Sequence, residues 1–250
     1  AATPCFFDPE SERVMSETKF EDIGLSPELV QAVSDMNYTQ ATGIQAQAIP
    51  LLMQGADVIG RSSTGTGKTA AFGIPAVERI ESGLKAPQVL VLSPTRELAM
   101  QIAGEIRKFA KYKPGVCVAA IYGGAPMDAQ IRALRAANIV IGTPGRVMDH
   151  MRRHTLRLDD LRTVVLDEAD EMLNMGFLDD IQTILAETPD TRQTVLFSAT
   201  MPPAILKITD EFLRDPQTVD IRTGQRTIAA VEQFFYRVPQ ARKMDALNLL

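Results

Sequence analysis

The segment Ser62-Ser63-Thr64-Gly65-Thr66-Gly67-Lys68-Thr69 constrains what this chain can fold into more than any other. It follows a short apolar run at residues 57–60 and precedes a helical pattern at residues 69–79. Glycine lets the backbone approach another group closely, and the N–H groups that begin a helix attract anions. The order strand, glycine-rich loop, helix is therefore typical of a loop that wraps a polyphosphate.

Within this loop, Lys68 would meet the β- and γ-phosphates as a point charge, and the Thr69 hydroxyl would bind a Mg²⁺ that bridges them. The strict form of the pattern has glycine at the position where this chain has Ser62. An ordinary glycine-rich turn before a helix is therefore the alternative that the loop alone leaves open.

The rest of the chain predicts a doubly wound α/β fold. Helical patterns begin with Ser26 as N-cap and Pro27 as the first residue, running to about residue 36, and continue near residues 45–54. Beyond the loop, apolar runs alternate with helical segments such as 97–111 and 179–186. Runs that are apolar on both faces indicate a mainly parallel sheet with helices on each side. These runs are residues 89–92, 116–121, 139–141, 164–166 and 195–197.

Polar segments follow four of the expected strands, and ligands of such sheets bind beyond the carboxyl ends of the strands. Hydroxyl, guanidinium and carboxylate groups at these positions suit a phosphate-rich ligand. The segments are Ser93-Pro94-Thr95-Arg96-Glu97, Gly142-Thr143-Pro144-Gly145-Arg146, Asp167-Glu168-Ala169-Asp170 and Ser198-Ala199-Thr200.

Asp167 and Glu168 have a direct interpretation beside a phosphate-binding loop. Asp167 can hold Mg²⁺ through its water shell, and Glu168 can orient and deprotonate the water that attacks the γ-phosphorus. The alternative is a carboxylate pair that caps the next helix.

Arg96, Thr143 and Arg146 offer the groups that contact a nucleic-acid backbone, and Gly124 either admits such a backbone or makes a tight turn. The net charge of −5 does not exclude this, because residues 96–157 hold 11 basic and 4 acidic side chains. The remaining 15 basic and 27 acidic side chains carry the negative charge, so one basic face is compatible with the composition.

Nothing in the sequence indicates export or insertion into a membrane, since it contains no apolar run of spanning length and no basic-then-apolar leader. Cys5 and Cys117 are far apart and lack the spacing of metal ligands, which suits a cytoplasmic protein.

His150 and His154 stand four residues apart on an expected helix, a spacing used for zinc. Met151 stands where zinc proteases have Glu, and no third ligand suggests itself, so we expect a solvated helix face. We expect the pairs Asp159-Asp160 and Asp179-Asp180 at helix starts.

Several motifs occur in a fixed order: Gly-Lys-Thr, Pro-Thr-Arg-Glu-Leu-Ala, Gly-Gly, Thr-Pro-Gly-Arg, Asp-Glu-Ala-Asp and Ser-Ala-Thr. In this combination the chain resembles the DEAD-box RNA helicase family over roughly residues 20–220, and bacterial cold-shock-type members look most similar. The resemblance implies a RecA-like ATP-binding domain at residues 15–222. Residues 1–14 would be an unstructured extension or cloning remnant, and residues 223–250 a linker and the start of a second RecA-like domain.

The resemblance also implies ATP and Mg²⁺ as cofactors and RNA as a partner. Gln45 would read adenine with its amide, and Phe20 would pack against that pocket. The phosphates would be held by Ser62, Ser63, Thr64, Gly65, Thr66, Gly67, Lys68 and Thr69. Thr69 and Asp167 would bind the metal ion, and the catalytic residues would be Lys68, Asp167 and Glu168. Arg96, Gly124, Thr143 and Arg146 would contact the backbone of one RNA strand without reading its bases, and Ser198 and Thr200 would couple nucleotide state to RNA.

The chain departs from the family pattern at four positions. The family usually has Ala and Gln in place of Ser62 and Ser63, and Gly and Pro in place of Asn37 and Ala41. Asn tolerates the left-handed backbone well, so we expect that change to be mild. Ala41 bears on the geometry of the adenine pocket, and the effect of Ser63 on nucleotide affinity is open.

In this family a second RecA-like domain supplies arginine fingers, and no His-Arg-x-Gly-Arg pattern occurs in the 250 residues. Such arginines are worth about 10³–10⁵ in rate. We therefore expect this chain alone to bind nucleotide, to hydrolyse it very slowly and not to unwind a duplex. The alternatives are a nucleotide-gated RNA- or protein-binding module without turnover and a P-loop ATPase that acts on DNA.

The apolar residues Val231, Phe234, Phe235, Tyr236 and Val238 are expected to pack on the first domain or on a second copy of the chain. This predicts self-association through residues 231–250.

Overall fold

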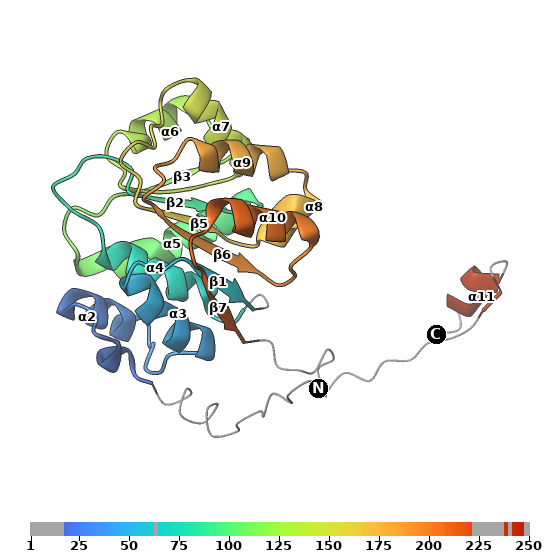
Figure 1. Ribbon diagram of the computed structural model, residues 1–250, viewed down its shortest axis with the longest axis horizontal. Helices are drawn as coiled ribbons and strands as arrows, with labels where there is room; N and C mark the ends of the chain where they lie inside the picture. The colour runs from blue at the N-terminus through green and yellow to red at the C-terminus, as the bar shows by residue number, and fades with distance from the viewer. Residues whose placement is uncertain (1–17, 63–64, 222–237, 240–241, 248–250) are drawn as a thin grey trace.

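A parallel β-sheet forms the centre of the computed structural model (Figure 1), which describes residues 18–62, 65–221, 238–239 and 242–247. Within those residues the sheet has seven strands in the order β3-β4-β2-β5-β6-β1-β7, and every neighbouring pair is parallel. The doubly wound α/β class is therefore confirmed. The strands are β1 (Val58–Arg61), β2 (Val89–Leu92), β3 (Val118–Ile121), β4 (Ile139–Gly142), β5 (Thr163–Leu166), β6 (Gln193–Ser198) and β7 (Gln217–Asp220).

Helices connect the strands and precede the sheet. None of the described helices combines the length and the apolar character that crossing a lipid bilayer requires. The helices are η1 (Phe20–Ile23), α2 (Pro27–Asp35), α3 (Gly43–Met53), α4 (Lys68–Glu78), α5 (Arg96–Phe109), η2 (Ala110–Tyr112), α6 (Met127–Leu134), α7 (Pro144–Arg152), α8 (Ala169–Asn174), α9 (Leu178–Ala186), α10 (Pro203–Phe212) and α11 (Lys243–Leu247).

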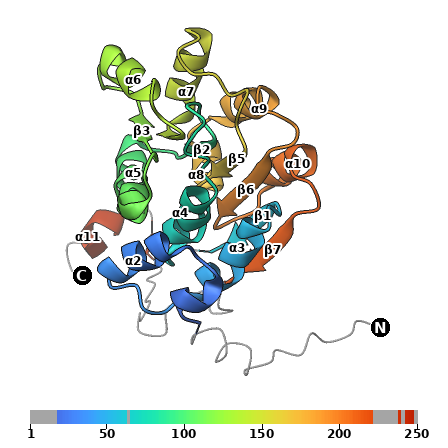
Figure 2. The same cartoon turned by 90° about the vertical axis from the view of Figure 1, so that its left-hand side faces the viewer.

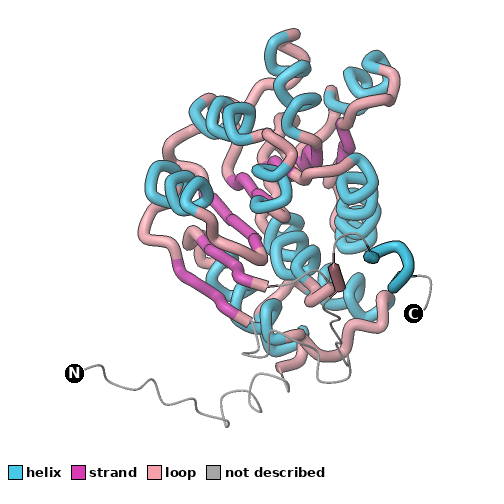
Figure 3. The backbone as a smooth tube through the Cα atoms, turned by 90° about the vertical axis from the view of Figure 1, so that its right-hand side faces the viewer, coloured by secondary structure: helices cyan, strands magenta, loops and turns pink. Residues whose placement is uncertain are grey.

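Each face of the sheet is covered by its own hydrophobic core, because alternate residues of a strand point to opposite faces. Val89 and Val91 of β2 pack into the core with α3, α4 and α5, whereas Leu90 and Leu92 pack into the core with α7, α9 and α10. Figures 2 and 3 show helices on both sides of the strands. The continuous apolar runs in the sequence thus reflect strands that are buried on both faces.

Strand β7 was not predicted from the sequence. It pairs with β1 at the edge of the sheet, and of its four residues only Val219 is buried. A single buried apolar residue gives no alternating pattern from which the strand could be predicted. The strand forms because the edge of β1 is available for pairing. Strand β3 also begins at Val118 rather than at residue 116.

The expectation for the two histidines is wrong. The side chain of His150 is buried, with Nδ1 2.8 Å from the Thr155 hydroxyl and Nε2 3.1 Å from the Gln130 amide oxygen. Helix α7 ends at Arg152, so His154 lies outside it, in an exposed turn with φ of 53°. His150 is a satisfied core residue rather than part of a solvated helix face.

Other local predictions have mixed outcomes. Asn37 has φ of 60°, which confirms that this position needs a residue tolerant of the left-handed region. Asp179 and Asp180 lie in the first turn of α9, as predicted. Asp159 and Asp160 lie in an exposed turn before β5, so the prediction that they start a helix is wrong.

The sequence predicts an extension at residues 1–14 and, at residues 223–250, a linker followed by the start of a second domain. Residues 1–17 and 222–237 lie outside the described residues, so the proposed boundaries of the RecA-like domain stay predictions. Val231, Phe234, Phe235 and Tyr236 lie outside them as well, and their proposed packing also stays a prediction.

Candidate functional site

The strand order separates the candidate residues into two neighbouring groups at the carboxyl edge of the sheet. Strands β5, β6 and β1 are adjacent, and they lead into Asp167, Ser198 and the glycine-rich loop. Strands β3, β4 and β2 are adjacent on the other side and lead toward Gly124, Thr143 and Arg96. The first group holds residue types that suit a nucleotide, and the second holds residue types that suit a nucleic-acid backbone.

The loop between β1 and α4 has the backbone that a phosphate-binding loop requires. Gly65 and Gly67 have φ values of 84° and 89°, in the region that side-chain-bearing residues rarely adopt, and Gly67 is the N-cap of α4. The N–H groups of the first turn of α4 therefore face the loop, where an anion binds best. Ser63 and Thr64, which were also predicted to hold phosphates, lie outside the described residues.

Two side chains from the start of α3 brace this loop. The Gln45 amide donates to the Gly67 carbonyl at 3.0 Å, and the Thr42 hydroxyl donates to the Thr66 carbonyl at 2.9 Å. The oxygen of the same amide accepts a hydrogen bond from the Thr42 backbone N–H at 2.9 Å. Within the loop, the Thr66 hydroxyl donates to the Ser62 hydroxyl at 3.1 Å.

Thr42 was missed by the sequence analysis, although a signal for it exists. Thr42 and Gln45 have the spacing of a capping box, in which the side chain of the third helical residue reaches back to the N-cap N–H. An amide has two N–H donors and two acceptor lone pairs, so the bonds of Gln45 leave capacity for a base. Phe20 is buried in the core against Tyr38, with 6.0 Å between the ring centroids.

Lys68 and Asp167 form a buried ion pair beside the loop. The Nζ atom of Lys68 lies 3.8 Å from Oδ1 of Asp167, and both side chains are less than 10% exposed, at 7% and 3%. Oδ1 of Asp167 has no hydrogen-bond partner among the described residues. Burial raises the pKa of the Asp167 carboxyl to about 6, even though the neighbouring Lys68 opposes the shift. A buried carboxylate whose Oδ1 atom accepts no hydrogen bond among the described residues favours the binding of a cation at this place.

Glu168, directly after Asp167, is the N-cap of α8 with φ of 52°. The left-handed region costs a residue with a side chain about 1–2 kcal/mol. Such strain is tolerated most often at functional sites. Glu168 occupies the N-cap position, but its side chain makes no capping hydrogen bond, so the alternative of a carboxylate pair that caps the helix holds only for the backbone position. A catalytic role for the carboxylate is compatible with this arrangement.

The fourth residue of the Asp-Glu-Ala-Asp segment, Asp170, is hydrogen-bonded to the segment that follows the neighbouring strand β6. Oδ2 of Asp170 accepts hydrogen bonds from the Thr200 N–H at 2.9 Å and from the Thr200 hydroxyl at 2.8 Å. The Ser198 hydroxyl donates to the Thr200 carbonyl at 2.6 Å. Burial raises the pKa of Asp170, but the hydrogen bonds from Thr200 and Ser198 outweigh it and leave the pKa below its usual range.

The sequence analysis assigned no role to Asp170. Its position in a strand-end segment was the only available signal, because the pairing with Thr200 depends on β5 and β6 being neighbours.

The candidate backbone-contacting residues gather around the turn that follows β3. A Cβ placed on Gly124 would lie 3.7 Å from a guanidinium nitrogen of Arg96, and Arg146 donates to the Ala125 carbonyl at 3.1 Å. Thr143 is the N-cap of α7, and its side chain makes no capping hydrogen bond. Arg96 begins α5 with its side chain 61% exposed. Two helix starts and two guanidinium groups therefore face one turn, which suits phosphate groups.

Comparison with protein families identifies the chain's relatives. The model of the DEAD/DEAH box helicase family matches residues 42–208. A protein of Bacillus cereus named DEAD-box ATP-dependent RNA helicase CshA is 47% identical over 234 residues, and ATP-dependent RNA helicase DeaD of Escherichia coli is 50% identical over 232 residues. These alignments cover 93% and 92% of this chain but 44% and 37% of the relatives. The chain thus spans less than half the length of these curated relatives.

Solved structures show the same fold. The crystal structure of a DEAD box protein from the hyperthermophile Methanococcus jannaschii matches with a TM-score of 0.80 and 37% identity, over 93% of this chain and 62% of that chain. The crystal structure of a hypothetical ATP-dependent RNA helicase from Sulfolobus tokodaii matches with a TM-score of 0.73 and 42% identity, over 78% of this chain and 57% of that chain.

Proposed function

The chain belongs to the DEAD/DEAH box helicase family, and on that premise we propose that it is the ATP-binding and RNA-binding domain of an ATP-dependent RNA helicase. The observation that carries the proposal is the strand order, which sets a nucleotide-type group of residues directly beside a backbone-contacting group. A domain that hydrolyses ATP in response to RNA needs both groups on one rigid frame.

In this proposal the loop from Ser62 to Thr69 binds the triphosphate with backbone N–H groups and with Lys68. Lys68 leaves Asp167 to meet the phosphates, since its Nζ is 3.8 Å from that carboxylate and is a flexible donor. The Gln45 amide binds the adenine edge while its bond to Gly67 ties base recognition to the phosphate-binding loop.

The residues present fit a Mg²⁺ ion. Thr69 and Asp167 offer the oxygen ligands that Mg²⁺ prefers, and the Oδ1 atom of Asp167 is buried without a hydrogen-bond partner among the described residues. Bound Mg²⁺ would supply positive charge to the phosphate oxygens. Among the described residues no three His, Cys, Asp or Glu side chains gather into a metal site, and phosphate-bound Mg²⁺ commonly uses only one or two protein ligands.

Glu168 acts as the base that orients and deprotonates the attacking water. Its backbone φ of 52° lies in the left-handed region, a strained conformation of the kind that is tolerated most often at functional sites. Replacement by Gln keeps the shape and removes the base, which makes Glu168→Gln the appropriate control for catalysis.

RNA is proposed to lie across the turn after β3, where Arg96 and Arg146 pair with phosphates, Thr143 donates its hydroxyl and Gly124 admits the backbone. These groups contact phosphate and sugar and carry no base sequence. Within the nucleotide-side group, Asp170 joins the segments that follow β5 and β6, because its carboxylate accepts two hydrogen bonds from Thr200. A shift of Asp167 and Glu168 on nucleotide binding would therefore move Thr200 as well.

We propose that unwinding of a duplex needs a part of the protein that the longer relatives have and these 250 residues do not include. That part would supply arginines to stabilise the charge on the transferred phosphate, because the described residues bring no such arginines to the site. The experiment is ATP hydrolysis by the 250-residue chain with and without single-stranded RNA, with Glu168→Gln as the background. Binding of a fluorescent ATP analogue is measured in parallel.

We expect saturable nucleotide binding, turnover close to the Glu168→Gln background and no strand separation. Absence of nucleotide binding would refute the proposal. RNA-stimulated hydrolysis that Glu168→Gln abolishes would keep the ATPase assignment but refute the need for further arginines. Stimulation by single-stranded DNA in preference to RNA would favour a DNA-dependent ATPase instead.

A further inference from the structure

A hollow of about 430 Å³ lies between the end of α7 and the side of α9, and none of the residues assigned above lines it. Its apolar wall consists of Met148, Met151, Leu156 and Leu158. Helices α7 and α9 lie side by side in Figures 1 and 2 and contact each other directly. Helix α7 starts near the proposed RNA contacts, and its nine residues span about 13 Å, so the hollow lies at the far end of the helix.

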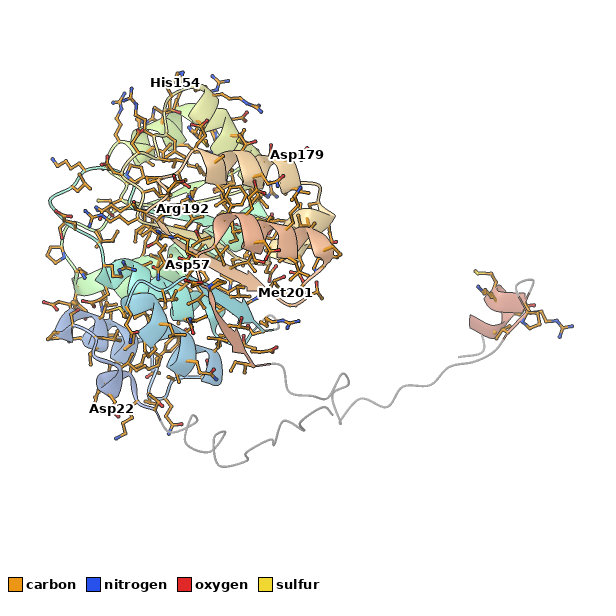
Figure 4. The ribbon with its side chains drawn as sticks, in the orientation of Figure 1. Asp22, Asp57, His154, Asp179, Arg192 and Met201 are labelled. Atoms are coloured by element: carbon orange, nitrogen blue, oxygen red, sulfur yellow. The ribbon has the colours of Figure 1, made fainter. Side chains whose placement is uncertain are left out.

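The rim of the hollow is basic. Arg152, Arg153, His154 and Arg157 fall within six residues and are all exposed, and Figure 4 shows His154 at the extremity of the molecule. Three of these side chains, those of Arg152, His154 and Arg157, line the hollow itself. Within the described part of the chain, none of the three arginines forms an ion pair.

Hydrogen bonds and a buried leucine fix the turn that carries these basic side chains. The Thr155 N–H donates to the His150 carbonyl at 3.0 Å, and the Thr155 hydroxyl contacts the buried His150 ring at 2.8 Å. Leu156 is 4% exposed and packs into the hydrophobic core that α7, α9 and α10 cover, which anchors the turn. A turn that is already ordered loses little conformational freedom when a ligand binds to it.

The chemistry of the hollow favours a peptide over a nucleic acid. Methionine side chains adapt to apolar ligand groups of different shape, and unpaired guanidinium groups bind carboxylates through charge-assisted hydrogen bonds. Asp159 and Glu187 also line the hollow and would repel a continuous polyphosphate. The lining residues include no Phe, Tyr or Trp ring on which a base could stack.

We propose that this hollow binds a short segment of a partner protein. In that segment one apolar anchor side chain has carboxylate side chains next to it on one side only. The anchor fills the space beside Met148 and Met151, and the carboxylates pair with Arg152 and Arg157. The acidic side chains of the hollow set the direction of the segment, because they disfavour carboxylates on the opposite side of the anchor. Since the site is distant from the strand ends, a docked partner leaves the nucleotide site accessible.

The test is selection from a random peptide library displayed on phage, with the 250-residue chain as bait and Arg152→Glu/Arg157→Glu as the counter-selection. Enriched peptides are then synthesised with a fluorescent label, and their affinity is measured by anisotropy. Methyl NMR of ¹³C-labelled methionine reports contact with Met148 and Met151. The matched control is Arg132→Glu/Arg135→Glu, on the last turn and at the C-cap of α6, which makes the same charge change at two other exposed arginines.

We expect enriched peptides that combine an apolar residue with adjacent carboxylates, and that shift the methyl signals of Met148 and Met151. Their affinity should fall about tenfold in Arg152→Glu/Arg157→Glu and stay unchanged in the control variant. The proposal is overturned if no peptide is enriched, if the enriched peptides lack carboxylates, or if the two double variants weaken binding equally. Methyl shifts caused by oligouridine instead of peptide would assign the surface to RNA and overturn it as well.

Discussion

Replacement of Gly67 by Ala is predicted to destabilise the chain more than replacement of Gly65, although both glycines have nearly the same backbone conformation. Their φ values are 89° and 84°, so an added side chain meets the same intrinsic backbone strain at both positions. The surroundings differ. A Cβ on Gly67 would lie 2.3 Å from the Gln45 amide nitrogen, whereas a Cβ on Gly65 would meet nothing within 4 Å.

The magnitude follows from these two contributions. The left-handed region costs about 1–2 kcal/mol for a residue with a side chain, which is the whole expected effect of Gly65→Ala. In Gly67→Ala the Gln45 amide must also move, and it then loses its bonds to the Gly67 carbonyl and the Thr42 N–H, at about 1 kcal/mol each. We therefore expect Gly67→Ala to cost about 2 kcal/mol more than Gly65→Ala.

The assay is urea unfolding followed by far-UV circular dichroism, since the chain has no Trp whose fluorescence would report on unfolding. The variants are Gly65→Ala, Gly67→Ala, Gln45→Ala and the double variant Gly67→Ala/Gln45→Ala. Gln45→Ala should lower the free energy of unfolding by about 2 kcal/mol in the wild-type background. The same change should cost little in the Gly67→Ala background, because the bonds are already lost there.

The reasoning is refuted by either of two results. If the two glycine variants are equally destabilised, the contact with Gln45 does not determine the tolerance of the loop. If Gln45→Ala costs the same in both backgrounds, the amide is not coupled to Gly67, and the proposed tie between base recognition and phosphate binding fails with it.

Three further predictions concern other parts of the fold. Thr200→Val should raise the pKa of Asp170, because it removes one of the hydrogen bonds that outweigh burial, and a carboxyl NMR titration that finds an unchanged pKa would contradict this. Burial lowers the pKa of His150 below 6.5, so the free energy of unfolding of the wild type should decrease as the pH falls from about 6.5 through the pKa of the folded state. His150→Gln should lack that decrease, which urea titrations at several pH values would measure. Gly60→Ala should cost about 1–3 kcal/mol, because its Cβ would lie 2.2 Å from the Phe197 ring between two buried strands, and an unchanged urea midpoint would show that the ring can move aside.

Local chemistry made much of the site predictable. The glycine-rich loop, the helix start that follows it and the left-handed Asn37 all depend on the conformational preferences of the residues themselves. The burial of whole strands was predictable for a similar reason, because a run such as residues 89–92 has no polar face to turn toward water. These features need no knowledge of which strand lies beside which.

Predictions failed where a residue's environment is made by distant parts of the chain. His150 has helical spacing to His154 and looks exposed on its own helix, but Gln130 and Thr155 enclose it from two other segments. Strand β7 has one buried residue and forms only because β1 has a free edge. The hydrogen bond from Gln45 to Gly67 joins two residues that are 22 positions apart in the sequence. Both residues were predicted to belong to the nucleotide site, but the hydrogen bond between them was not predicted.

The amino-acid sequence by itself determined the parallel α/β class, the glycine-rich loop before a helix and the kinds of polar groups at the ends of the strands, because each depends on residue type and short-range spacing. Only the tertiary structure decided how these groups are sorted, since the order of strands in a sheet is set by long-range pairing and not by order along the chain. That pairing sets Asp167 beside Lys68, Thr200 against Asp170, and Arg96 next to Gly124.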